Sequence, residues 1–230
     1  MSANVDTNAL LLQVMAHDLL APLTAVKWQL ELLEKSKNDK EKCKKNLDGI
    51  NASVQLGIAL TKHAHVAAKV LTESYESDVS SGSLTDIVTK AVNELVPQYE
   101  RHGLVLESDI GVEDLTRELD TALTELLVWS LTKFFLTVAP ASTTVHLRGI
   151  CVSQDDGPCM YMLVGDAAGI PDQEDATEMF QTLQARNAYD QTYVFVKLMH
   201  ETAKLLDVTV TANSQPNLLA VELSFPRKSV

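Results

Sequence analysis

The sequence contains few cysteines. The three that it has, Cys43, Cys151 and Cys159, are odd in number and do not have the spacing of a metal site. Disulfide-stabilised secreted domains and zinc modules carry cysteines in even numbers or in closely spaced pairs. The sequence therefore favours free thiols, and we expect the protein to work in a reducing cytoplasm.

Basic residues are also scarce, with 19 Lys and Arg against 31 Asp and Glu and a formal net charge of −12. An acidic surface repels a phosphate backbone, so we expect no nucleic-acid partner. The longest apolar runs are far shorter than the roughly 20 residues of a membrane span. Residues 1–6 lack the basic region of a signal peptide. We therefore expect a chain that does not contact a membrane.

Apolar residues make up 46% of the 230 residues, enough for one large domain or two small ones. Residues 4–36 and 41–75 each show the spacing of three and four that is typical of an amphipathic helix. A short polar link between them predicts an antiparallel hairpin. A lone hairpin leaves its apolar seam in water, so we expect a homodimer with a four-helix bundle, buried at Leu47, Ile50, Val54 and Ile58.

The second half combines helices with a largely antiparallel sheet, which is typical of an α+β fold. Residues 77–83 read as a polar linker, with Ser83 as a helix cap. The expected helices are 84–103, 115–135 and 189–206, and the expected strands are 104–108, 144–152, 160–164, 208–211 and 219–223, with a turn at 155–158. We therefore predict two domains, a helical hairpin at 1–76 and an α/β sandwich at 83–230.

One segment of the first helix stands out: His17-Asp18-Leu19-Leu20-Ala21-Pro22-Leu23-Thr24-Ala25. His17 and Asp18 interrupt an apolar run, and Pro22 predicts a kink close to the histidine. From the spacing alone, a surface histidine on a core helix is the simpler interpretation. The segment, however, resembles the phospho-acceptor box of bacterial histidine kinases, His-Asp/Glu-Leu-Arg-x-Pro-Leu-Thr.

This resemblance implies that His17 accepts a phosphoryl group and that Asp18 orients it. The family's arginine is replaced by Leu20, and the Thr or Asn that family phosphatases use is replaced by Ala21, so we expect no phosphatase activity. A receiver-domain partner would dock on the surface of Leu20, Ala21, Thr24 and Lys27. For Lys27 a solvated surface lysine is the simpler interpretation, and Leu20 and Ala21 fit bundle core equally well.

The order of elements in residues 83–230 resembles the ATP-binding domain of the same kinases, but the nucleotide motifs are eroded. The position of the magnesium-binding Asn falls on Trp129 or Ser130, neither of which suits Mg²⁺. Asp166 and Gly169 are vestiges of an Asp-x-Gly-x-Gly box. The third box, residues 187–196, has no glycine and places Asp190 where phosphates would lie. We therefore expect no bound nucleotide cofactor and no metal.

The resemblance implies a histidine phosphotransferase of a two-component phosphorelay. His17 would take a phosphoryl group from one receiver aspartate and pass it to another without ATP, and the receiver would supply Mg²⁺. Two alternatives stay open: a histidine kinase without a sensor domain, and a non-catalytic pseudokinase that acts as a scaffold for response regulators. Nucleotide binding distinguishes the kinase from the phosphotransferase. The effect of replacing His17 distinguishes the pseudokinase from the phosphotransferase.

Overall fold

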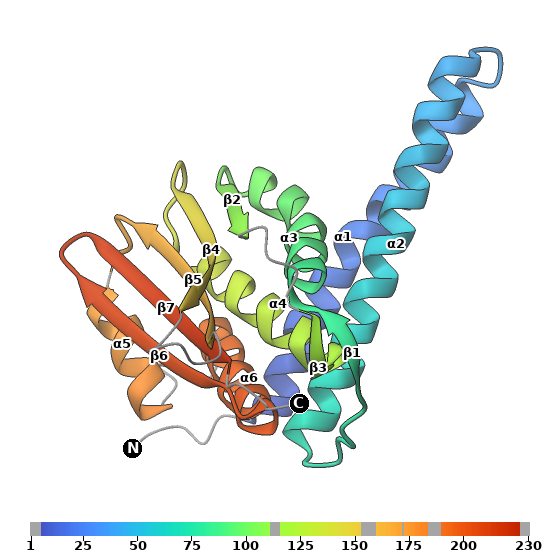
Figure 1. Cartoon of the computed structure of the whole chain (residues 1–230). Coiled ribbons are helices and arrows are strands. Elements are labelled where there is room, and N and C mark those ends of the chain that lie inside the picture. The colour runs from blue at the N-terminus through green and yellow to red at the C-terminus, as the bar shows by residue number, and fades with distance from the viewer. Residues whose placement is uncertain (1–5, 111–115, 153–159, 172, 184–189, 226–230) are drawn as a thin grey trace.

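The computed structural model describes residues 6–110, 116–152, 160–171, 173–183 and 190–225. It begins with two long antiparallel helices, α1 (Thr7–Lys35) and α2 (Lys40–Leu71), whose linked ends project away from the rest of the molecule (Figure 1). Asp6 and Asp39 begin them, since each carboxylate accepts hydrogen bonds from backbone amides of the first turn. Helix α1 continues through Pro22. The predicted hairpin is present, with bounds close to those expected.

The rest of the chain contains two sheets and four helices among the described residues. In chain order the elements are β1 (Val79–Ser83), α3 (Leu84–Arg101), β2 (Val105–Ile110), β3 (Thr116–Asp120), α4 (Thr121–Val138), β4 (Thr144–Val152), β5 (Met160–Ala168), α5 (Gln173–Thr182), α6 (Gln191–Leu206), β6 (Thr209–Gln215) and β7 (Leu218–Phe225). Ser83 caps α3 as predicted, because its Oγ accepts from the amide of Asp86. The predicted α+β class is confirmed.

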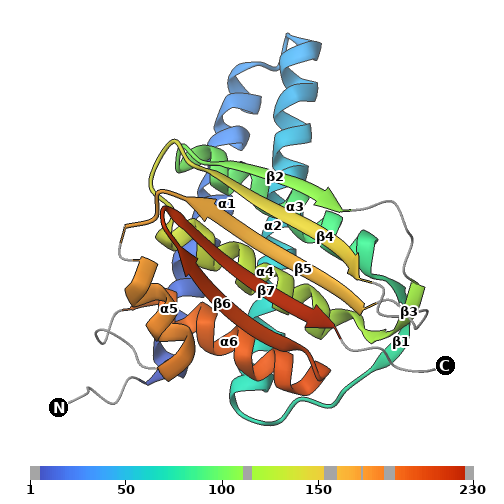
Figure 2. The same ribbon diagram turned by 60° about the vertical axis from the view of Figure 1, so that its left-hand side comes forward.

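The main sheet has the strand order β2-β4-β5-β7-β6. β2 pairs with β4 in parallel, and every other neighbouring pair in this sheet is antiparallel. Helices α3, α4 and α6 cover one face of the sheet, and the hairpin lies beyond this helical layer (Figure 2). Side chains on β7 alternate between buried and half-buried positions, as expected for a sheet with one covered face.

Two expectations for the second half are wrong in detail. The linker contains strand β1, which pairs antiparallel with β3. The helix expected from residue 115 begins at Thr121, because Thr116–Asp120 form β3 and the Asp120 carboxylate caps α4 through the amide of Leu123. Leu115, Leu119 and Leu123 are spaced by four residues and so extend the helical spacing back across β3, and only the cap marks the boundary. Helix α5 was not anticipated, and the turn at 155–158 lies outside the described residues.

The hairpin and the α/β half share one hydrophobic core. Leu10 and Val14 of α1 and Ala67 and Val70 of α2 are buried in the same cluster as α4 and α6. Helix α4 lies between the sheet and the hairpin, so most of its side chains are buried. The division at 1–76 and 83–230 stays a prediction, because this core is continuous across it.

Within the described part of the chain, two helices, α1 and α4, are by length and composition apolar enough to cross a membrane. Helix α4 has 72% of its apolar window buried inside the protein, which identifies it as a core helix. The corresponding fraction for α1 is 28%. For α1, the expectation that the chain does not contact a membrane stays a prediction.

Asp120 joins the end of the hairpin to the start of α4. Its buried carboxylate accepts hydrogen bonds from the hydroxyls of Tyr75 and Ser77 and from the amides of Asp78 and Leu123, at 2.8–3.2 Å. Burial of the Tyr75 hydroxyl and its bond to Asp120 raise the pKa of Tyr75 well above its ordinary value. One side chain thus caps α4 and anchors the connection after α2.

We predict that Asp120→Ala lowers the free energy of unfolding by about 2–4 kcal/mol, because it removes a helix cap and leaves several partly buried donors without an acceptor. Urea denaturation monitored by circular dichroism measures this change. Ser83→Ala, which removes a cap with a single hydrogen bond, is the control and should cost only about 1 kcal/mol. Equal losses in the two variants would contradict the role of Asp120 as an anchor.

Candidate functional site

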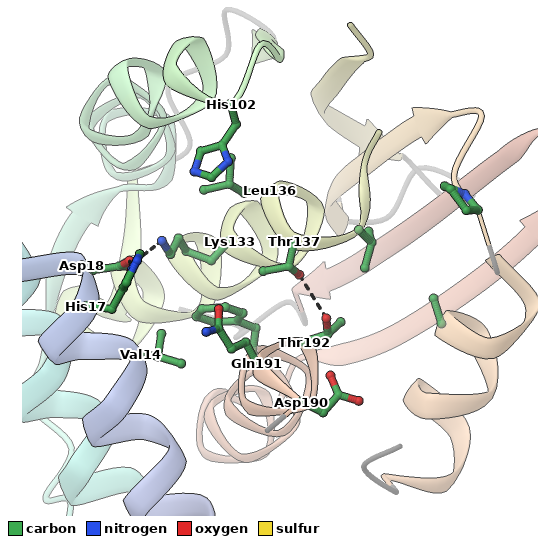
Figure 3. Close-up of a pocket in the computed structure, with 14 residues that line it drawn as sticks. Val14, His17, Asp18, His102, Lys133, Leu136, Thr137, Asp190, Gln191 and Thr192 are labelled. Carbon is green, nitrogen blue, oxygen red and sulfur yellow. Dashed lines mark hydrogen bonds and ion pairs between the residues drawn. The ribbon is translucent and has the colours of Figure 1, made fainter. Parts of the chain in front are cut away.

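His17 and Asp18 lie at a cleft between the hairpin and the α/β half, which we call the His17 cleft (Figure 3). The cleft has a volume of about 640 Å³. Its other walls come from α4, through Lys133 and Thr137, and from the start of α6, through Asp190 and Thr192. The structure thus brings the candidate phospho-acceptor and the region of the former nucleotide motifs into one cavity.

The imidazole of His17 is 79% exposed, whereas the carboxylate of Asp18 is only 13% exposed. Nδ1 of His17 lies 3.4 Å from Oδ1 of Asp18. This is longer than a usual hydrogen bond, as catalytic contacts often are before a partner binds. The carboxylate of Asp18 therefore reaches the ring of His17, although consecutive residues of a helix do not share a face.

Lys133 is the residue that turns Asp18 inward. Its ammonium lies 2.5 Å from Oδ2 of Asp18 and 2.9 Å from Oε1 of Gln98, and only 4% of the residue is exposed. The rings of Trp129 and Phe195 each lie with their centroids 5.8 Å from Nζ. Burial lowers the pKa of Lys133, and the adjacent Asp18 opposes this shift. Asp18 is thus held between a buried cation and the exposed imidazole.

Sequence reasoning did not identify Lys133 or Gln98. The sequence signal for Lys133 was its place within the largely apolar stretch of residues 126–135. Lysine is almost never fully buried without a partner, so a lysine there indicates a buried ion pair. Its partner comes from a helix more than 100 residues earlier, which no local pattern connects to it.

The predicted docking residues divide between two surfaces. Leu20, Thr24 and Lys27 are exposed, and with His17 they follow the three- and four-residue spacing of one helix face. Leu20 is 62% exposed. Ala21 instead lines a groove of about 930 Å³ between the hairpin and α3. The stripe formed by His17, Leu20, Thr24 and Lys27 is named the acceptor stripe.

The vestigial residues Asp166 and Gly169 do not line the His17 cleft. Asp166 is buried and forms an ion pair with Arg148. In the strand register Asp166 lies opposite His146, whereas its neighbour Gly165 lies opposite the buried Leu147. Because side chains alternate along a strand, Asp166 faces away from the helical layer. Gly169 lines a separate surface hollow near Asn217.

Gly165 occupies the position of β5 that faces α4. A methyl group at Gly165 would lie 2.7 Å from Cε2 of Phe135 and 3.2 Å from Cδ2 of Leu147. The Phe135 ring therefore fills the space beneath the strand. Period-two alternation starting from Leu163 was the sequence signal that Gly165, and not Asp166, faces inward.

Trp129 and Ser130, the two candidates for the lost Asn position, are also outside the cleft lining. The Trp129 ring stacks on His63 of α2 with centroids 5.2 Å apart, and it contacts Phe195 edge-on. Ser130 is fully buried. His63 is a packing residue, with Nε2 3.4 Å from Oε2 of Glu94. The described residues contain no group of three or more His, Cys, Asp or Glu side chains suited to a metal ion.

Asp190 caps α6 at the edge of the His17 cleft. Its carboxylate accepts a hydrogen bond from the amide of Tyr193 at 3.3 Å. A helix N-terminus binds phosphate through free amides and its partial positive charge. At α6 the carboxylate of Asp190 accepts from one of these amides, and whether it excludes a phosphate there stays a prediction. Nearby, the Thr192 hydroxyl contacts that of Thr137 at 3.3 Å.

Comparison with known proteins identifies the fold. No family model matches the chain. The chain is 24% identical over 147 residues to the Sensor protein QseC of Salmonella typhi and of Salmonella typhimurium, which covers 62% of this chain and 32% of each relative. The chain thus spans about a third of the length of the curated relatives that it matches.

Solved structures match a larger part of the chain than the curated relatives do. The histidine kinase AdeS of Acinetobacter baumannii superposes with a TM-score of 0.51 and 16% identity, over 91% of this chain and 96% of that one. A structure described as a bacterial phosphotransferase superposes with a TM-score of 0.55 and 14% identity, over 97% of this chain and 98% of that one. The chain has the fold of a histidine kinase cytoplasmic core. The cytoplasmic segment of QseC also matches, with a TM-score of 0.50 and 14% identity, over 75% of this chain and 96% of that one.

These likenesses confirm the predicted resemblance at the level of the fold. They favour the alternative of a histidine kinase without a sensor domain over the phosphotransferase, because the curated relatives are sensor proteins and AdeS is a histidine kinase. The relay function and the roles of individual residues stay predictions.

We predict that Arg148→Met lowers the free energy of unfolding by about 1–3 kcal/mol, because it leaves the buried Asp166 carboxylate without its cation. The half-exposed position of Arg148 keeps this loss moderate. In the Arg148→Met, Asp166→Asn double variant no charge is left unpaired, so part of the loss should be recovered. Urea denaturation checks both values, and an Arg148→Met variant as stable as the wild type would contradict the prediction.

Proposed function

We propose that the protein is a histidine phosphotransferase that relays a phosphoryl group between receiver-domain aspartates through His17. The observation that carries this proposal is the exposed imidazole of His17 beside an ion-paired Asp18 at the mouth of a cleft. An exposed nucleophile suits a macromolecular donor, because the donor must bring its phosphorus atom within about 3–3.5 Å of the attacking nitrogen.

The reaction requires little covalent chemistry from this chain. Nε2 of His17 attacks the phosphorus of a receiver phospho-aspartate, the P–O bond breaks, and the aspartate carboxylate leaves with the bonding electrons. Positive charge then develops on the ring, and the adjacent Asp18 carboxylate stabilises it. The receiver brings the Mg²⁺ that neutralises the phosphoryl oxygens. Transfer to a second receiver is the reverse of these steps.

Three contacts support a mechanism without ATP. The Asp166 carboxylate pairs with Arg148 on the outer face of the sheet. The Phe135 ring lies against Gly165 on the inner face. Asp190 covers the N-terminus of α6 with negative charge. A nucleotide would have to displace protein groups at each position. The likeness to a bacterial phosphotransferase over nearly the whole chain also supports the relay.

A second candidate is an ATP-dependent histidine kinase. Two findings favour it: the curated relatives are sensor proteins, and His17 faces the same cleft as the α4 and α6 residues of the former nucleotide region. In this case ATP itself would label His17. The test of the main proposal therefore includes ATP as a separate phosphoryl donor.

We predict that a phosphorylated receiver domain labels the wild-type protein and that His17→Gln abolishes labelling. A panel of receiver domains charged with acetyl phosphate serves as the donor, and the label is followed on Phos-tag gels under neutral conditions. His17→Gln should keep its stability within about 0.5 kcal/mol of the wild type, because the side chain is exposed. His65→Gln is the matched control, as another exposed histidine of the hairpin, and should label normally.

Labelling with Mg-ATP alone would instead support the kinase. Retention of labelling in His17→Gln would contradict His17 as the acceptor in both enzymatic proposals. No labelling from any donor would contradict both proposals and favour the pseudokinase scaffold.

We also propose that the protein forms a homodimer and docks receivers on the acceptor stripe. Leu47, Val54 and Ile58 of α2 remain exposed in the single chain, as do Leu23 and Trp28 of α1. Contiguous exposed apolar surface of this kind marks an interaction site. Histidine kinase homologues in general dimerise and act on response regulators. A four-helix bundle formed by two copies of the hairpin would cover much of this apolar surface. We place this activity in the cytoplasm, by likeness to the QseC segment.

We predict that Ile58→Asp dissociates the dimer, because it places a charge in the apolar seam. Sedimentation velocity at micromolar concentration measures the change. Ile150→Asp on the outer face of the sheet is the matched control, since Ile58 and Ile150 are 45% and 44% exposed. A wild-type protein that sediments as a monomer would contradict the homodimer.

A further inference from the structure

The buried ion pair between Lys133 and Asp18 is not needed to fill the core. Nζ of Lys133, in an otherwise largely apolar stretch of α4, lies 5.8 Å from the ring centroids of both Trp129 and Phe195. Removing an ammonium from water costs several kcal/mol, and replacement of a buried ion pair by apolar residues of similar size is often neutral or stabilising. Methionine has a similar length and would pack at this position. The lysine therefore points to a role other than stability.

The ion pair divides the two oxygens of Asp18 between two partners. Oδ2 contacts Nζ of Lys133 at 2.5 Å, and Oδ1 is left facing Nδ1 of His17 at 3.4 Å. The ammonium of Lys133 also donates a hydrogen bond to Oε1 of Gln98 at 2.9 Å, and this second contact fixes the position of Nζ. Figure 3 shows Lys133 reaching from α4 to Asp18 next to His17. Nε2 of His17 has no hydrogen-bond partner among the described residues.

We propose that Lys133 is a positioning residue for phosphotransfer at His17. By holding Oδ2, it keeps Oδ1 in place to accept the Nδ1 proton of the neutral imidazole, so that the lone pair lies on Nε2. The inference rests on the proposed function, and it adds that the α/β half contributes a side chain to the reactivity of the histidine. Lys133 acts through Asp18 and does not contact the reacting atoms.

This arrangement makes two kinds of measurement informative. The first is the tautomer of His17, read from the nitrogen shifts and couplings of its ring in ¹⁵N-labelled protein above the pKa of the imidazole. The second is the rate of phosphorylation by phosphoramidate, a small donor that needs no partner. In that reaction Nε2 attacks phosphorus, the P–N bond of the donor breaks, and ammonia leaves with the bonding electrons.

We predict that His17 of the wild type carries its proton on Nδ1 and that Lys133→Met shifts the population toward the Nε2-protonated form. The phosphorylation rate should fall about 10- to 100-fold, as expected when a reacting group is displaced by about 1 Å. Lys90→Met is the matched control, because Lys90 also forms a 2.5 Å ion pair between helices, with Glu125, away from His17. It should leave both readouts unchanged.

A double-mutant cycle separates positioning from structural damage. Asp18→Asn should slow the reaction by a similar factor, and Lys133→Met combined with Asp18→Asn should be no slower than Asp18→Asn alone, because the lysine acts through the carboxylate. The double variant also leaves no buried charge unpaired, so it remains testable if Lys133→Met folds poorly. A multiplicative loss in the double variant would overturn the proposal.

The outcomes distinguish this inference from the proposed function. If Lys133→Met is phosphorylated at His17 at the wild-type rate and has the wild-type tautomer, the inference is overturned and the relay proposal stands. An Nε2-protonated His17 in the wild type also overturns it. A wild-type protein that accepts no phosphoryl group, from phosphoramidate or from any receiver, overturns the relay itself.

Discussion

The burial of α4 is the constraint on which the rest of the structure depends. The helix lies between the sheet and the hairpin, so its residues must satisfy two apolar surfaces at once. Phe135 points to the sheet at Gly165, and Trp129 points to the hairpin at His63. A helix in this position has little surface left for polar ligands. Lys133 is the charged residue buried on this helix among those described, and it lies where the hairpin presents Asp18.

The features that could be predicted from the sequence are those with a local physical cause. The hairpin follows from the apolar spacing of two long segments, and Ser83 marks the start of α3 because a hydroxyl there caps free amides. The exposed position of His17 follows from a polar pair in an apolar run. Each of these depends on residues within a few turns of one another.

The features that could not be predicted depend on distant partners. Strand β3 pairs with β1, and apart from the cap residue Asp120 nothing in residues 116–120 distinguishes that strand from the first turn of α4. The ion pair of Asp18 with Lys133 spans two halves of the fold. Composition and periodicity carry no record of such pairings.

The same long-range contacts change how the relation to histidine kinases is understood. A nucleotide site and a phospho-acceptor make opposite demands on the surface between the hairpin and the α/β half. ATP needs free amides and room at the start of α6, whereas a histidine that serves an external donor needs only a fixed orientation and access from outside. In this chain the Asp190 carboxylate accepts from the amide of Tyr193, the core is continuous across the two halves, and Lys133 pairs with Asp18 beside His17. The α/β half thus supplies the buried cation that pairs with the carboxylate next to the histidine.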